Sequence, residues 1–332
     1  MPNFSKPLAF FSKIRYTKDN ENRKDAIAMT ELQRLKNMTV PAGCVDCVLD
    51  TDTYNEIDDQ FALSFMMKHE KFNVRALYAA PFYNNNSTSP EDGMEKSYDE
   101  ILNLLALMGM PEKKAITHRG SRIYLPNEHT PVPSPAADHL CDLAMQYSPE
   151  NPLYVIAIGA ITNIASAILY KPEIVERIVI VWLGGHDKSW PDTKEFNLWQ
   201  DVAAARVVFG CGAPIIQLPC MGVVSAFYTT KPELEYWLRG KNPLCDYLVD
   251  HTIEEAESYA AGRVWSRVIW DVTAVAWIVN DNDRFMTSVL EPAPIPEYDG
   301  YYAYTKNRPE IRRVTYIHRD ALLGELFRVL AL

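Results

Sequence analysis

The sequence predicts an α/β fold with an open, mostly parallel, twisted sheet and helices on both faces. Three observations support this prediction. Short apolar runs typical of buried strands alternate with helical patterns between residues 44 and 278. Glycines end two of the runs, at Gly159 and at Gly184-Gly185. No repeat or linker divides the 332 residues, of which 48% are hydrophobic, so the chain can bury one large core.

The elements follow in order from local patterns. The first strand is expected at residues 44–49, and a helix follows at 59–68 because Phe61, Ala62, Phe65 and Met66 share one helical face. Further strands are expected at 72–80, 153–158, 178–183 and 214–218, and further helices at 94–108, 162–169, 202–209, 234–237, 244–259 and 271–278. Residues 81–90 and 119–135 form loops rich in turn formers and prolines, as lids and binding loops often are.

Residues 1–40 are polar and basic, with a helix expected at about 25–35. We interpret them as an N-terminal extension, and residues 41–332 as a single domain. The net charge of −10 argues against a nucleic-acid partner. No apolar run reaches the roughly 20 residues that span a bilayer, and no signal-like segment is present. Six irregularly spaced cysteines do not form a disulfide framework, so we expect a cytoplasmic protein in a reducing compartment, without a membrane partner.

Four aspartates fall within ten residues, where the first strand ends and the first helix begins: Asp50, Asp52, Asp58 and Asp59. Ligands of open α/β sheets bind in the crevice at this edge. Clustered carboxylates repel one another unless a proton or a cation offsets their charge, and a hard divalent cation prefers oxygen ligands. Acidic helix capping would explain one or two of these acids, but not four. The cluster therefore predicts a cation site.

The same acids, together with three later blocks, resemble the motifs of the nucleoside hydrolases (inosine–uridine-type ribohydrolases). Four blocks occur in the family's order between residues 45 and 280, which is much more specific than one block alone. The blocks are Asp50-Thr51-Asp52 with Asp58-Asp59, Gly159-Ala160-Ile161-Thr162-Asn163-Ile164-Ala165, Gly184-Gly185 with Glu195-Phe196-Asn197 and the helix at 203–209, and Trp270-Asp271. The first block has five residues, 53–57, where the family has three. A substrate difference could begin at this insertion.

The resemblance implies a Rossmann-like core and a calcium-dependent hydrolysis of a ribonucleoside's N-glycosidic bond, which gives ribose and free base. It also implies a role for each matching residue. A metal-bound water attacks the sugar through an oxocarbenium-like transition state, and Asp52 is its general base. Calcium is held by Asp52, Asp59, Asp271 and the backbone carbonyl of Ile158, whereas the ribose is held by Asp58, Glu195 and Asn197. Asp50 supports the loop as a hydrogen-bond acceptor. The resemblance further implies a homodimer or homotetramer.

Departures from the family pattern cluster around the leaving group. Trp270 stands where the family usually has a histidine that acts as the leaving-group acid. A tryptophan cannot donate a proton, but it can stack on a base, and a purine-leaning branch of the family also has tryptophan here. Alternatively, Trp270 is a core aromatic residue. His186 is a candidate for the missing acid, and Asn84 is a candidate for a missing amide in a segment of otherwise solvated turn residues. Arg263 and Arg267 are expected to form salt bridges, although they could face a phosphate on a modified substrate.

Three alternatives to a nucleoside hydrolase remain at this point. The first is a hydrolase of another ribosyl compound that uses the same metal site, which the altered base loops would favour. The second is a ribose- or nucleoside-binding protein without turnover, which the missing histidine would favour and the retained aspartates disfavour. The third is a magnesium-dependent phosphatase with a nucleophile in Asp50-Thr51-Asp52, which the Glu195-Phe196-Asn197 block disfavours. The tyrosine-rich segment at 298–304 has no assigned role, and a pocket wall, an interface and an edge hairpin all remain open for it.

Overall fold

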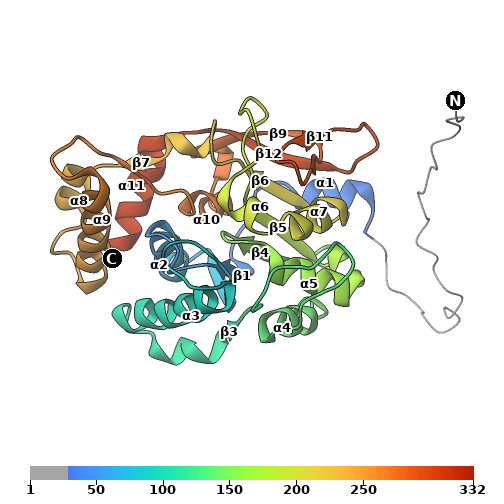
Figure 1. The fold of residues 1–332 in the computed structure, drawn as a ribbon, viewed down its shortest axis with the longest axis horizontal. Coiled ribbons are helices and arrows are strands. Elements are labelled where there is room, and N and C mark those ends of the chain that lie inside the picture. The colour runs from blue at the N-terminus through green and yellow to red at the C-terminus, as the bar shows by residue number, and fades with distance from the viewer. Residues whose placement is uncertain (1–28) are drawn as a thin grey trace, which may run out of the picture.

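The computed structural model describes residues 29–332, which are built around an eight-stranded sheet (Figure 1). The strand order is β3 (Thr117–Arg119), β2 (Phe72–Ala79), β1 (Val45–Thr51), β4 (Leu153–Ala157), β5 (Ile178–Leu183), β6 (Ile215–Leu218), β12 (Glu310–Ile317) and β9 (Met286–Pro292). Neighbouring strands are parallel except for the antiparallel pair of β12 and β9. The predicted α/β fold with a mostly parallel sheet is confirmed.

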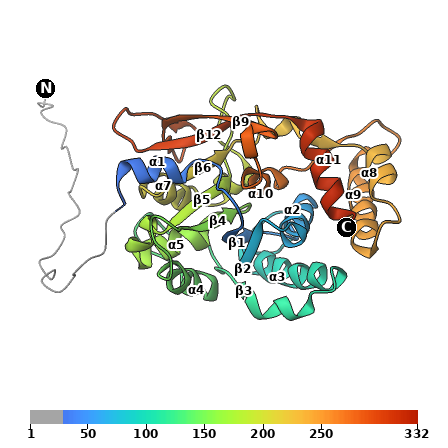
Figure 2. The same cartoon turned by 180° about the vertical axis from the view of Figure 1, so that it is seen from behind.

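Helices cover both faces of this sheet, as the front and back views show (Figures 1 and 2). Buried side chains of α2 (Asp58–Lys68), α3 (Pro90–Leu107), α10 (Val272–Trp277) and α11 (Arg319–Leu330) share one core. Those of α4 (Pro135–Ala144), α5 (Thr162–Tyr170) and α7 (Val202–Gly210) share the other. Strand β1 serves both cores, since Cys47 and Leu49 belong to the first and Val48 to the second. This alternation follows from the two-residue period of a strand.

The remaining elements complete the described part of the chain. They are α1 (Glu31–Asn37), α6 (Phe196–Gln200), α8 (Lys231–Trp237), α9 (Pro243–Ala260), the pair β7 (Tyr228–Thr229) and β8 (Arg267–Val268), the pair β10 (Ile295–Pro296) and β11 (Tyr302–Ala303), and 3-10 turns at Pro111–Ile116, Pro172–Glu176, Val224–Ala226 and Asp281–Asp283. Within residues 29–332, no helix combines the length and hydropathy needed to cross a membrane.

The predicted elements match most of the core, with shifts of a few residues. The expected helix at 25–35 lies partly outside the described residues, and α1 occupies Glu31–Asn37. Arg34 of α1 donates a hydrogen bond to the carbonyl of Glu310 at 2.7 Å, so this helix contacts the sheet. The division into an extension and a domain at residue 40 stays a prediction. Several elements of the sheet and core were not predicted: β3, α4, α6, β9, β12 and α11.

The strand register places the acidic segment at one edge of the sheet. Asp50 of β1 lies opposite Ala157 of β4, and the amide of Ile158 donates to the carbonyl of Asp50 at 2.9 Å. The residues that follow both strands therefore leave the sheet side by side. This edge is formed by the carboxyl ends of the parallel strands, where ligands of such folds bind.

Candidate active site

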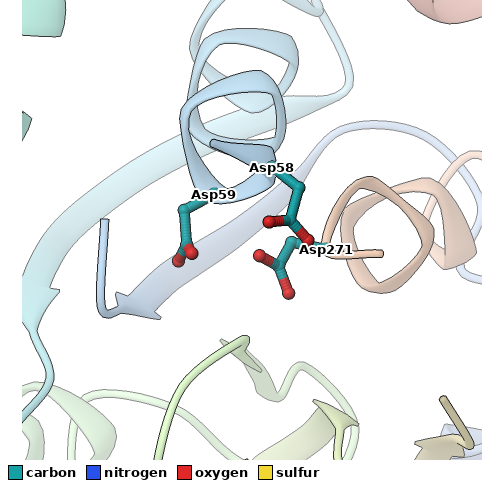
Figure 3. Close-up of side chains that lie close together, drawn as sticks. All are labelled: Asp58, Asp59 and Asp271. Carbon is teal, nitrogen blue, oxygen red and sulfur yellow. The ribbon is translucent and has the colours of Figure 1, made fainter. Parts of the chain in front are cut away.

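Three buried carboxylates from two helix starts converge at this edge (Figure 3). Asp58 and Asp59 begin α2, and Asp271 directly precedes α10. One oxygen of each lies within 4.8 Å of the others. Burial, opposed by the Arg267 charge and reinforced by Glu56, raises the pKa of Asp58 to about 8, and burial raises the pKa of Asp59 to about 6. The negatively charged forms of these neighbouring acids are therefore disfavoured when no cation is bound. This agrees with the predicted cation site.

Asp52 lies next to this group without a polar partner. Its side chain is buried, and neither carboxylate oxygen has a hydrogen-bond partner among residues 29–332. Burial, and then the charges of Asp59 and Asp58, raise the pKa of Asp52 well above its usual range. Burial of a charged carboxylate without partners lowers the stability of the fold by roughly several kcal/mol, unless a cation or a proton neutralises its charge. These oxygen-rich groups fit a hard cation such as calcium. The three carboxylates that lie close together are those of Asp58, Asp59 and Asp271. The sequence had predicted Asp52 as a ligand in the place of Asp58.

A cavity of about 250 Å³ opens beside the acids. It gathers residues from six separate stretches of the chain: Asn55, Glu56, Asp58, Ile158, Leu183, His186, Lys194, Glu195, Phe196, Asn197, Cys220, Met221, Trp270 and Asp271. Most of the predicted ligand and substrate residues are therefore in one place. Asp52, Asp59 and Asn84 are not among the lining residues. Asp59 is a buried member of the carboxylate cluster, Asp52 is buried beside it, and Asn84 supports a neighbouring loop.

Glu195 and Asn197 are held by backbone groups at the ends of β4 and β5 and at the start of α6. The Glu195 carboxylate caps α6 by accepting from the amides of Asn197 and Leu198, each at 2.9 Å, and it accepts from the amide of Gly185 at 2.8 Å. The Asn197 amide nitrogen donates to the carbonyls of Ile158 and Leu183, each at 3.1 Å. The same carbonyl of Ile158 is the predicted metal ligand, and its second lone pair remains for a cation. Asn197 thereby fixes the direction of this carbonyl.

The turn that supplies Gly185 requires a glycine. Its φ is 76°, in the left-handed region. A Cβ atom at Gly185 would lie 1.9 Å from the hydroxyl oxygen of Tyr302. Tyr302 of β11 belongs to the tyrosine-rich segment, and its hydroxyl also lies 3.3 Å from the side-chain nitrogen of Gln217. This segment therefore packs against the wall of the cavity, which was one of the three roles considered for it.

The segment 53–57, which is two residues longer than the family pattern, lies directly at the cavity. Its residue Glu56 forms an ion pair with Arg267 of β8, and Arg267 also lies 3.7 Å from Asp58 and 3.1 Å from Glu255. The expected salt bridges of Arg267 are confirmed. Asn84 does not reach the cavity lining, but donates to the side chain of Asn55 at 2.6 Å.

Several lining residues were missed at the sequence level. Asn55 and Glu56 could have been found, because a loop between two site acids must pass the site. Lys194 and Phe196 flank the predicted residue Glu195 in the sequence. Cys220 and Met221 follow β6, so the rule that ligands bind at the carboxyl ends of the strands would have included these two residues. Asp50 has the supporting role that was expected, since it accepts from the side-chain nitrogen of Asn163 at 2.7 Å.

Comparisons with known proteins support the motif assignment. The family model described as inosine-uridine preferring nucleoside hydrolase matches residues 47–315. A pyrimidine-specific ribonucleoside hydrolase, RihA, from Klebsiella pneumoniae (strain 342) is 23% identical over 309 residues, which cover 82% of this chain and 95% of the relative. A non-specific ribonucleoside hydrolase, RihC, from Salmonella schwarzengrund is 29% identical over 160 residues, which cover 47% of this chain and 50% of the relative.

Solved structures share the fold at low identity. A purine-preferring ribonucleoside hydrolase from Gardnerella vaginalis has a TM-score of 0.68 and 22% identity, and the match covers 86% of this chain and 98% of that one. The type III effector protein XopQ, solved with adenosine diphosphate ribose, has a TM-score of 0.65 and 15% identity, with 91% and 98% covered. Because the family model spans most of the chain, this protein belongs to the inosine-uridine preferring nucleoside hydrolase family and is an N-glycosyl hydrolase.

Proposed function

We propose that this chain is a calcium-dependent ribonucleoside hydrolase with a preference for purine nucleosides, which it converts to ribose and free base. The observation that carries the proposal is the set of buried aspartates beside a cavity lined by Glu195, Asn197 and Trp270. The acids provide a site for a cation that can hold sugar hydroxyls. The cavity places polar groups and an aromatic ring next to that site.

The ligands proposed for calcium are Asp52, Asp59, Asp271 and the carbonyl of Ile158. Asp58 also lies within 4.8 Å of Asp59 and Asp271, so it can interact with the ion or with a sugar hydroxyl beside it. When bound, calcium would orient the ribose hydroxyls and lower the pKa of a nearby water. The partnerless oxygens of Asp52 support its role as the general base, because they are free to accept a proton from that water.

Side chains on the other wall would hold and orient the substrate. The Asn197 side-chain nitrogen is engaged by two carbonyls, which leaves its oxygen to accept from a ribose hydroxyl. Glu195 is fixed by three backbone amides and contributes negative charge that stabilises an oxocarbenium-like sugar. Trp270 lines the cavity and would stack on the base. This stacking surface is the basis of the purine preference.

An assay with five nucleosides tests the proposal. The purified protein is incubated with inosine, guanosine, adenosine, uridine and cytidine, with calcium or with a chelator, and released ribose is measured. We expect release from purine nucleosides first, and loss of release with chelator and in Asp52→Asn. Asp142→Asn is the matched control, because its side chain is 85% exposed and remote from the cavity lining. Ribose release by Asp52→Asn at the wild-type rate would refute the role of Asp52.

A second candidate is the hydrolysis of another ribosyl compound at the same site. Asn55 and Glu56 of the lengthened segment 53–57 line the cavity, so this segment forms part of the surface that would meet the substrate. The structural neighbour solved with adenosine diphosphate ribose makes that compound a suitable probe. Adenine released from it, with all five nucleosides inert, would favour this candidate. Tight binding of a nucleoside without turnover would instead favour a binding protein.

The assembly and location expected from the sequence stay predictions. A homodimer or homotetramer would be detected by light scattering of the purified chain. A cytoplasmic location would be detected by fractionation of the source cells.

A further inference from the structure

His186 occupies a rigid position in the wall of the cavity. The backbone on either side of it pairs with the segment after β6: the amide of Cys220 donates to the carbonyl of Gly185 at 2.8 Å, and the amide of Asp187 donates to the carbonyl of Met221 at 3.0 Å. The side chain of Asp187 is further anchored by Arg313 of β12. The His186 ring is 9% exposed, and its neighbour Trp190 meets it edge-on with 5.8 Å between ring centroids. The ring is therefore held from several sides.

One hydrogen bond determines where the proton of this ring lies. The backbone amide of Met221 donates to Nδ1 of His186 at 3.2 Å. A nitrogen that accepts a hydrogen bond carries no proton, so the neutral ring has its proton on Nε2. Burial lowers the pKa of His186, and the charge of Asp192 opposes this only in part. The ring is consequently a neutral donor at pH 7.

The Nε2–H group has no acceptor within residues 29–332, and the residue lines the cavity. A donor in a mostly closed wall that lacks a protein partner is available to a bound molecule. Trp270 provides a flat apolar surface in the same cavity. A heterocyclic base presents both a flat face and acceptor atoms at its edge, so it is complementary to this pair of side chains.

On the basis of the proposed function, we propose that His186 is a catalytic residue that donates a hydrogen bond from Nε2–H to an acceptor atom of the departing base. When the C1′–N bond breaks, its electron pair moves to the base, and the donor stabilises the negative charge that develops there. The proton stays on His186, since its loss would leave an imidazolate. The base takes its proton from solvent, and the water that adds at C1′ releases one, so the reaction balances as nucleoside plus water to ribose plus base.

Two substrates with different leaving groups test this role. Inosine has a base that needs a hydrogen-bond donor to depart, whereas 4-nitrophenyl β-D-riboside releases a phenolate that needs none. For His186→Leu we expect kcat for inosine to fall by about 10²-fold with little change in KM, and kcat for the nitrophenyl riboside to stay within about threefold of wild type. His186→Gln keeps a donor near the position of Nε2, and we expect it to restore part of the inosine activity. His129→Leu, at an exposed loop position, is the matched control.

The outcomes separate this inference from the proposed function. If both substrates lose activity equally in His186→Leu, the residue has only a structural role, and an unchanged rate for inosine would mean no role at all. A glutamine variant as inactive on inosine as the leucine variant would also overturn the hydrogen-bond assignment. If the wild-type protein cleaves the nitrophenyl riboside but no nucleoside, the proposed function itself fails. The unfolding temperature of each variant is measured to confirm that it is folded.

Discussion

Asn163 connects four parts of the fold behind the active site, so its replacement by alanine should destabilise the protein strongly. Its side-chain nitrogen donates to Asp50 at the end of β1 at 2.7 Å and to the carbonyl of Ala79 of β2 at 3.4 Å. Its oxygen accepts from the amide and the hydroxyl of Ser121 at 2.8 and 2.9 Å, and from the hydroxyl of Ser134 at 3.4 Å. Alanine removes all of these contacts.

The size of the effect follows from the groups that lose their partners. The amide of Ser121 and one carboxylate oxygen of Asp50 would be left buried and unpaired, whereas the hydroxyls can rotate toward other acceptors. A buried polar group without a partner costs about 1–3 kcal/mol, so two such groups give a loss of roughly 2–6 kcal/mol in the free energy of unfolding.

Equilibrium unfolding in urea, followed by circular dichroism, measures this loss. Asn151→Ala makes the same chemical change at an exposed position and should change the free energy by less than about 0.5 kcal/mol. If Asn163→Ala and Asn151→Ala are equally stable, the hydrogen bonds of Asn163 do not join the strand ends, and the reasoning is wrong.

Three further predictions concern the cation, Arg267 and acid stability. Calcium at 100 times its Kd should stabilise the fold by about 2.7 kcal/mol, which raises the unfolding temperature. The Asp271→Asn variant should not show this increase. An unfolding temperature of the wild-type protein that does not change with calcium would argue against the site. Arg267→Met removes the buried guanidinium that pairs with Glu56 and Glu255, so urea unfolding should show a loss of roughly 3 kcal/mol. A loss near zero would mean that these ion pairs do not stabilise the fold. Burial and the neighbouring His139 lower the pKa of His118 to about 4, so the folded chain binds fewer protons than the unfolded chain. Stability should fall from pH 6.5 toward pH 4, and His118→Gln should flatten this decline in urea titrations, whereas an unaltered slope would contradict the assignment.

The central strands could be predicted because they are buried on both faces. A strand such as β5 is a continuous apolar run, Ile178–Leu183, and all of its residues are buried. Strand β12 was missed because Arg312 and Arg313 interrupt its apolar pattern. The structure accommodates Arg313 through ion pairs with Glu291 of β9 and with Asp187, partners that are distant in sequence. No local pattern reveals such a compensation.

The site was predictable to the extent that motifs occupy strand ends and helix starts. Asp58, Glu195, Asn197 and Asp271 all meet at the cavity, as their blocks implied. The partnership of Met221 with His186 could not be predicted, because it depends on how two loops pair after the sheet has formed. Contacts between loops carry no periodic signal, and the sequence alone does not specify their register.

The strand order also has a consequence for how the protein is made. Strand β6 has β5 on one side and β12 on the other, and residues 219–309 separate β6 from β12 in the chain. At 5–20 residues per second, a ribosome needs roughly 5–20 s to synthesise that stretch. During this interval the outer edge of β6 has no strand to pair with, and a growing chain with an open, apolar sheet edge can associate with other chains. Strand β12 thus covers this edge, and a chain that is truncated before β12 should aggregate during its own synthesis.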